Sequence, residues 1–333
     1  MALQAARSLV QGAVRDGLTQ LDELVVAPLS GRFEQPALVS FLFHGVFESR
    51  SEAASGVAHP QEAMTTSDFE QLVEYFSGAG YRFVSVAEIE SGLEEQGRYA
   101  CLTFDDGYAS TARIVDVLRK YSIPAVVYVS TSYVDSGKRY WWDAIYDERS
   151  KRGAGARAIA REIGFLERRP PEEIDRYVER EFGQGASRPK SDLDRPLTPE
   201  ELKHLASEEH VTVGNHTSEH AVLAGAGSGL VRKQLEDAQL YLERVLGAVP
   251  TSVSYPEGAY DAETITVVRD LGFASGFTTV RRRERLPIAG AQLLELGRFK
   301  LRRSADLTRQ LRVARSELRL ADAARGVLRR GAR

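Results

Sequence analysis

The feature that most constrains the fold is an apolar run that ends abruptly in two carboxylates and a glycine. Residues 99–104 (Tyr-Ala-Cys-Leu-Thr-Phe) are followed directly by Asp105-Asp106-Gly107. Such runs form buried strands, and glycine permits the sharp turn that a strand end needs. A helical pattern in residues 108–121 and a second apolar run in residues 124–129 complete a strand–helix–strand unit. Because sites in parallel α/β folds lie at the carboxyl ends of strands, both carboxylates are expected at a functional rim.

A second polar cluster follows another short β-type run. Val211-Thr212-Val213 precedes the segment Gly214 to His220, which places His216 and His220 four residues apart. On a helical turn the two imidazoles would lie on one side, roughly 6 Å apart, close enough to share a metal. Each motif alone has a non-functional explanation: Asp105-Asp106-Gly107 could be a solvated turn, and His216 and His220 could be a chance pair on a surface helix. Together they favour a three-ligand site of two imidazoles and one carboxylate, with open positions for water and substrate.

These residues resemble the motifs of polysaccharide deacetylases, carbohydrate esterase family four, whose domain is also called the NodB homology domain. Residues 103–107 match the family's first motif and residues 216–220 its second, His-Ser/Thr-x-x-His. The resemblance runs roughly from residue 38 to residue 299. It implies an α/β fold, an incomplete (β/α)7 barrel, with Asp105 as general base. It also implies a divalent metal held by three ligands, Asp106, His216 and His220.

The third family motif corresponds here to residues 254–258, Ser-Tyr-Pro-Glu-Gly. The resemblance assigns the backbone amide of Tyr255 to the stabilisation of the oxyanion. Ser254 stands where the family has an arginine that orients the catalytic aspartate, and Glu257 replaces an aromatic residue and is expected at the substrate. We hypothesise that Arg298, from another strand, supplies the missing guanidinium.

The general acid of the family is a histidine in its last motif, and this chain has no histidine after His220. Some family members have a permuted order, in which the strand that bears this histidine lies at the N-terminus. Residues 37–43 form an apolar run followed by His44, which resembles that strand. We therefore expect His44 to protonate the leaving amine, a role that suits an imidazole at neutral pH.

The chain of 333 residues, 43% of them hydrophobic, can form one large α/β domain over residues 37–301. Its net charge of −3 differs from the positive charge that is typical of nucleic-acid-binding proteins, so no DNA or RNA partner is expected. A helical insertion is expected at about residues 135–197. It contains Trp141 and Trp142, interpreted either as packing between insertion and barrel or as a stacking wall that binds sugar rings.

The two ends of the chain are expected to be helical. Residues 1–36 are predicted to form an amphipathic helix rather than a signal peptide, and no apolar stretch approaches the roughly 20 residues that span a bilayer. A cytoplasmic location is the default expectation. Residues 302–333 contain ten arginines and are predicted to form a basic helix, either solvated or in peripheral contact with anionic lipid of a membrane.

The leading prediction is a metal-dependent hydrolase that removes N-acetyl groups from amino sugars of a polysaccharide, an oligosaccharide or a glycan precursor. One alternative is a hydrolase of another C–N bond, such as a cyclic amide or a formyl group. Another is a non-catalytic glycan-binding protein. The metal is predicted to be zinc, with cobalt, nickel or manganese as alternatives. The residues leave open whether the N-acetylated substrate is a polymer, a lipid-linked glycan or a nucleotide sugar.

Overall fold

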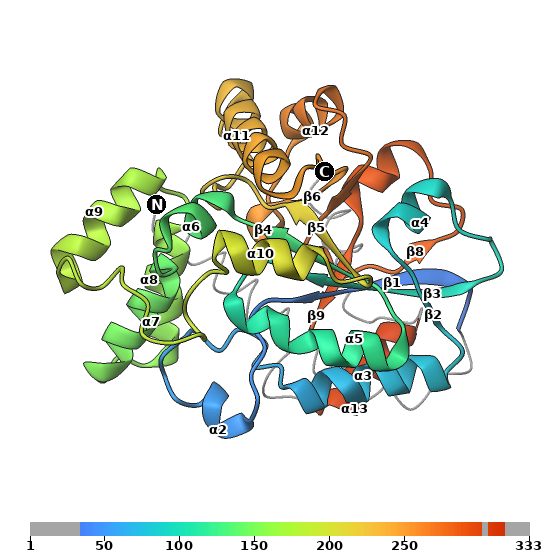
Figure 1. Cartoon of the computed structure of the whole chain (residues 1–333), viewed down its shortest axis with the longest axis horizontal. Helices are drawn as coiled ribbons and strands as arrows, with labels where there is room; N and C mark the ends of the chain where they lie inside the picture. Colours follow the sequence, from blue (N-terminus) through green and yellow to red (C-terminus); the bar gives the residue numbers. More distant parts are fainter. Residues whose placement is uncertain (1–33, 302–305, 317–333) are drawn as a thin grey trace, which may run out of the picture. The chain divides into compact units, whose positions relative to one another are not determined.

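A computed structural model describes residues 34–301 and 306–316 of the chain (Figure 1). The chain divides into two compact units, of which the larger is Ala37–Arg303. The described helix of the other unit is α13 (Leu307–Arg315). The helix predicted over residues 1–36 and most of the basic segment 302–333 lie outside the described residues. Among those described, no helix is both long and apolar enough to cross a bilayer.

The larger unit is built on one curled sheet. Its strands are β1 (Ala37–Phe43), β2 (Arg82–Phe83), β3 (Arg98–Phe104), β4 (Ala125–Val129), β5 (Val211–Asn215), β6 (Ser252–Ser254), β7 (Ser275–Phe277), β8 (Glu284–Arg285) and β9 (Arg298–Lys300). The order β7-β6-β5-β4-β3-β1 is parallel throughout, β2 pairs with β3, and β8 pairs antiparallel with β1.

The last strand brings the sheet back to the first. Strand β9 pairs parallel with β1, and the Thr278 amide donates to the Leu296 carbonyl at 2.8 Å, which joins the end of β7 to the segment before β9. The sheet therefore curls toward closure through seven strands, β1, β3, β4, β5, β6, β7 and β9. The expected incomplete (β/α)7 barrel is confirmed.

Helices separate most of the strands, and a group of them forms the insertion. The helices of this unit are α2 (Arg50–Ala53), α3 (Thr66–Gly78), α4 (Val86–Ser91), η2 (Ala109–Ile114), α5 (Val115–Tyr121), α6 (Thr131–Ser136), α7 (Trp141–Lys151), α8 (Ala156–Leu166), α9 (Pro171–Phe182), α10 (Pro199–Ala206), α11 (Ser228–Leu246), η3 (Pro256–Gly258), α12 (Ala262–Asp270) and η4 (Gly290–Glu295). Figure 1 shows α7, α8 and α9 grouped beside one another, apart from the helices that flank the strands.

Two predicted elements differ from the structure in kind. The helix predicted over residues 108–121 begins as the 3-10 helix η2 and becomes α-helical only at Val115. The apolar pattern of residues 293–301 predicts a strand, but this run begins in the 3-10 helix η4, so β9 is only three residues long. In both places the chain leaves or enters the barrel, and a 3-10 turn reverses its direction with fewer residues per turn than an α-helix needs.

The registers of the central strands decide where the functional residues meet. Strands β1 and β4 are buried along their whole length, and β3 is exposed only at Arg98. Phe43 pairs with Phe104, and Val129 pairs with Asn215. Because these pairs end their strands in parallel, residues 44, 105 and 216 leave the sheet at the same rim.

The insertion has its own apolar core, to which both tryptophans belong. This core includes Tyr108, Tyr140, Trp141, Trp142, Ile159, Leu166 and Val178. Beside it lies the buried guanidinium of Arg139, which is 2.6 Å from Asp194 and 3.1 Å from Asp147. This pairing ties α7 to the loop that returns to the barrel.

Candidate functional site

Asp105 follows β3 and is held by a guanidinium inside the barrel. Both nitrogens of the Arg298 fork donate to the two Asp105 oxygens, each at 2.7 Å, and the Ser254 hydroxyl donates to Asp105 Oδ2 at 3.0 Å. Arg298 lies at the start of β9 and is completely buried. Burial alone would raise the pKa of Asp105, but Arg298, together with His216 and His44, outweighs burial and lowers that pKa below its ordinary value, so the group is a carboxylate at neutral pH.

Asp106 turns away from Arg298 toward the two histidines of the second motif. Its φ of 76° lies in the left-handed region, which non-glycine residues seldom adopt. Asp106 Oδ1 is 3.4 Å from Nε2 of both His216 and His220. This oxygen is buried and has no hydrogen-bond donor among the described residues. A buried carboxylate oxygen that lies between two imidazole nitrogens and has no donor fits the role of a metal ligand.

The two histidines converge, but the segment that carries them is not helical as predicted. Residues 216–220 form a loop in which Thr217 and His220 have positive φ values of 63° and 55°. The loop is shaped locally: Asn215 Oδ1 accepts from the Thr217 amide at 2.8 Å, so a side chain replaces a helical hydrogen bond. Asp106, His216 and His220 nonetheless bring one ligand atom each within 4.8 Å of one another.

The histidines differ in their electrostatic surroundings. Nδ1 of His216 lies 2.8 Å from the Ser254 carbonyl, which orients Nε2 toward Asp106. Burial works to lower the pKa of His216, but Asp105 and Asp106 outweigh it and raise that pKa. Burial lowers the pKa of His220, which favours the neutral imidazole that binds metals.

His44 lies across the same rim and pairs with a carboxylate that the sequence did not single out. His44 Nδ1 is 2.8 Å from Glu62 Oε2, and Lys300 Nζ is 3.0 Å from Glu62 Oε1. Burial would lower the pKa of His44, but Glu62 reverses the effect and raises it; the two cations lower the pKa of the buried Glu62 to about 2. Glu62 comes from a loop without a motif, so no spacing in the sequence connects it to His44.

The third motif lies against the site, but the expected role of the Tyr255 amide is contradicted. That amide donates to the Phe277 carbonyl at 3.0 Å as part of the β6–β7 pairing, and is therefore not free to bind an oxyanion. Pro256 has no N–H. The next amide is that of Glu257, whose φ is 56° and which makes no hydrogen bond to any described residue. Glu257 thus offers the first free N–H after the strand.

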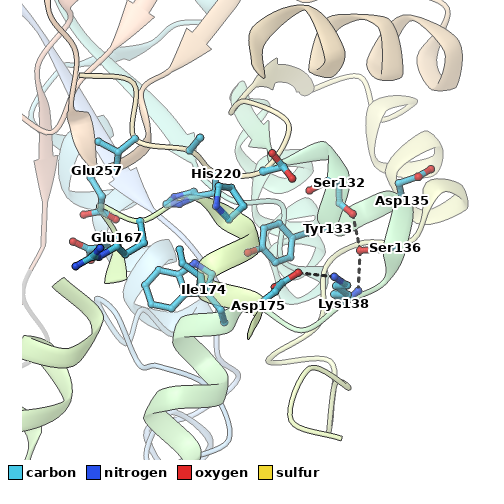
Figure 2. Close-up of a pocket in the computed structure, with 16 residues that line it drawn as sticks. Ser132, Tyr133, Asp135, Ser136, Lys138, Glu167, Ile174, Asp175, His220 and Glu257 are labelled. Carbon is cyan, nitrogen blue, oxygen red and sulfur yellow. Dashed lines mark hydrogen bonds and ion pairs between the residues drawn. The ribbon is translucent and has the colours of Figure 1, made fainter. Parts of the chain in front are cut away.

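A cavity of about 250 Å³ opens beside the histidines (Figure 2). It is lined by His220, by Trp141 and Ile174 of the insertion, and by Glu257. Figure 2 shows Glu257 and Glu167 on one side of His220 and Tyr133 on the other. Trp142 does not line the cavity; its ring packs on His220 with centroids 4.7 Å apart. The structure therefore brings Trp141 and Glu257 to the cavity and Trp142 to a candidate ligand.

An α/β barrel with two imidazoles and a carboxylate at its rim has the donor set that metal-dependent hydrolases use. The polysaccharide deacetylase family model matches residues 93–276, more than half of the chain. The chain therefore belongs to the polysaccharide deacetylase family. A segment of 83 residues is 28% identical to the Bacillus subtilis (strain 168) protein that bears the name polysaccharide deacetylase YxkH. This match covers 25% of the chain and only 29% of the length of YxkH.

Solved structures are similar over a larger part of the chain. The Streptococcus pyogenes deacetylase PplD in complex with acetate has a TM-score of 0.57 at 18% identity, covering 84% of this chain and 99% of PplD. IcaB from Ammonifex degensii has a TM-score of 0.59 at 19% identity, with coverages of 85% and 98%. At such identities the likeness establishes a common fold.

Proposed function

We propose that this chain is a metal-dependent deacetylase that removes acetyl groups from N-acetylated amino sugars of an oligosaccharide or polysaccharide. The observation that carries the proposal is that one rim of the barrel holds three groups of residues with different contacts. Asp106, His216 and His220 converge as possible metal ligands, Asp105 is bound by Arg298, and His44 is paired with Glu62. Family membership supports the same activity.

Asp106, His216 and His220 would hold the metal ion, and the orphaned Asp106 Oδ1 supports that assignment. Zinc suits two imidazoles and one carboxylate, and cobalt, nickel or manganese would also fit this donor set. When bound, a divalent ion acidifies water and polarises the acetyl carbonyl.

Asp105 is the proposed general base. It is ionised, fixed in orientation by two short hydrogen bonds from Arg298, and not one of the three converging ligands. It would accept the proton of the water that attacks the acetyl carbonyl carbon. The Glu257 amide, rather than that of Tyr255, would donate to the oxyanion that develops on the carbonyl oxygen.

His44 is the proposed general acid. Amide cleavage requires a proton on the leaving nitrogen, and Glu62 keeps the imidazolium of His44 protonated to higher pH. After Asp105 has taken one proton from water and His44 has given one to the leaving nitrogen, the products are the free amine of the sugar and acetic acid, which ionises to acetate.

The charge of the cavity favours a neutral glycan over a nucleotide sugar or a lipid-linked glycan. Its lining includes two cations, Lys138 and Arg169, against five carboxylates: Asp135, Glu167, Asp175, Glu219 and Glu257. Burial, and after it the neighbouring Glu257, raise the pKa of Glu167 to about 7. A pyrophosphate would be repelled here, whereas the Trp141 ring suits a sugar face.

Three further expectations stay predictions. They are a cytoplasmic location, membrane contact through residues 302–333, and the division of the chain into residues 1–36, 37–301 and 302–333.

The test is acetate release from N-acetylglucosamine oligomers by zinc-loaded wild type and Asp105→Asn, with metal content measured for both. Wild type is expected to release acetate, and the variant to be slower by about a hundredfold or more with its metal retained. UDP-N-acetylglucosamine is expected to be the poorer substrate. A metal-loaded wild type that releases no acetate from any oligomer would contradict the proposal.

A further inference from the structure

The two candidate histidine ligands are held in place by different means. The ring of His216 is fixed by its contact with the Ser254 carbonyl. The ring of His220 makes no hydrogen bond to any described residue, and its Nε2 lies 3.4 Å from Asp106 Oδ1. What restrains it is ring packing, since the Trp142 indole lies 4.7 Å away between centroids and the His216 ring 4.9 Å away. Metal-binding histidines usually have a hydrogen-bonding outer partner that fixes the ring, and at His220 ring packing stands in its place.

The third candidate ligand, Asp106, is also held by a residue of the insertion, two positions before Trp142. Tyr140, the residue just before α7, donates from its hydroxyl to the Asp106 carbonyl at 2.9 Å. The same carbonyl accepts the Ser130 amide at 3.1 Å. These two bonds secure a backbone conformation that costs a non-glycine residue free energy.

Both aromatic residues are themselves anchored in buried contacts. The Trp142 indole N–H donates to the Tyr108 hydroxyl at 2.6 Å, and that hydroxyl donates to Asp143 Oδ2 at 2.8 Å. Asp143 Oδ1 accepts the His59 amide at 2.6 Å. The Tyr140 and Trp142 rings stack with centroids 4.9 Å apart. The first turn of α7 is thereby connected to the loop that carries Glu62.

We propose that Tyr140 and Trp142 are positioning residues of the metal centre, Tyr140 for Asp106 and Trp142 for His220. The inference rests on the metal site of the proposed function. Neither side chain reaches the reacting atoms; each fixes a ligand before the ion arrives. The insertion therefore supplies preorganisation of the metal site in addition to a wall of the cavity.

The experiment titrates Zn²⁺ and Co²⁺ into the metal-free full chain and into Trp142→Leu, Tyr140→Phe and Val178→Ala. The Kd, the visible spectrum of the Co²⁺ form and the thermal midpoint of the metal-free form are recorded. Trp142→Leu is expected to weaken metal binding by about tenfold or more and to alter the Co²⁺ spectrum. Tyr140→Phe removes one hydrogen bond and is expected to weaken binding by about fivefold.

Val178→Ala is the matched control, because Val178 is buried in the same insertion core and does not line the cavity. It is expected to lower the thermal midpoint while the Kd and the Co²⁺ spectrum stay unchanged. Wild-type Kd values in both aromatic variants, or an equal loss of affinity in Val178→Ala, would overturn the positioning role. A wild type that binds no metal would instead refute the metal centre. Should Trp142→Leu not fold, Tyr140→Phe decides, since it deletes a single oxygen atom.

Discussion

Two adjacent buried aspartates can differ in function because each has its own counter-charges. Asp105 faces the Arg298 guanidinium, while Asp106 faces His216 and His220. A continued strand would point the two carboxylates to opposite faces of the sheet. The left-handed φ of Asp106 ends the strand geometry, and both carboxylates lie near His216, whose Nε2 is 3.9 Å from Asp105 Oδ2 and 3.4 Å from Asp106 Oδ1. One carboxylate is thus available as a base and the other as a ligand.

Replacing Arg298 by lysine tests the orientation of the base. Lysine keeps the charge but loses the two-pronged contact, so we expect kcat to fall by about a hundredfold, as reactive geometry of this kind is sensitive to displacements of about 1 Å. Ser254→Ala removes one hydrogen bond to Asp105 and leaves both guanidinium contacts, and serves as the milder control. Steady-state rates at equal metal content measure both. A full rate in Arg298→Lys would exclude Arg298 as the orienting group.

Replacing Glu62 by glutamine tests the acid through the pH profile. The Glu62 carboxylate raises the pKa of His44, so its removal lets burial dominate and that pKa falls. The protonated, active form is then lost at lower pH, and the alkaline limb of kcat/KM is expected to move to lower pH. Glu48→Gln, in the same loop region but largely exposed, should leave the limb in place. An unmoved limb in Glu62→Gln would separate Glu62 from the acid step.

The sequence predicted the residues that lie in motifs and missed those that reach the site through folding. Asp105, Asp106, His216 and His220 follow strand ends and carry recognisable spacing. Glu62 meets His44 only because an irregular loop folds over the rim, and no periodicity encodes that contact. The Tyr255 amide was misassigned because strand pairing, which decides whether an N–H is free, is not visible in a single strand.

At the scale of elements, strands are fixed by burial, whereas connections depend on local polar contacts. Strands β1, β3 and β4 were predictable from their apolar runs. The loop that carries His216 and His220 was predicted as helical, yet the Asn215 side chain and two positive φ values bend it otherwise. The histidines still converge, because β5 delivers them to the same rim as β3.

The anchorage of the insertion gives an element-scale prediction. Arg139 is buried between Asp147 and Asp194. Asp147 also pairs with Lys151 and Lys190, but Arg139→Ala removes the ion-pair partner of the fully buried Asp194 and should cost about 3–5 kcal/mol of stability. Arg195→Ala breaks pairs with the partly exposed Glu201 and the exposed Asp192, and should cost less than about 1 kcal/mol. Urea unfolding measures both, and limited proteolysis should find cleavage within residues 183–196 only in Arg139→Ala. Equal stabilities would show that the buried cluster is not an anchor.

At the scale of the molecule, the barrel is completed by two strands that come from opposite ends of the larger unit's sequence. The family match spans residues 93–276, yet β1 with His44 and β9 with Arg298 lie outside it. Because β9 pairs with β1, the proposed acid and the group that orients the base come from neighbouring strands. The third motif lacks an arginine, and the chain lacks a histidine after His220. The neighbouring strands β9 and β1 supply the proposed substitutes, Arg298 and His44.

Metal removal provides the last prediction, at the scale of the whole fold. The candidate ligands lie beyond the strand ends, and the strands β1, β3 and β4 are buried almost along their whole length and contain none of the three ligands. Chelation is therefore expected to abolish acetate release while the far-UV circular dichroism is retained. A ligand at a hundredfold excess over its Kd adds about 2.7 kcal/mol, so for a chain of this size the thermal midpoint should fall by roughly 4–5 °C on chelation. Zinc should restore both activity and midpoint. Cooperative unfolding upon chelation would instead make the ion a structural element, since sites of that kind supply the folding energy themselves.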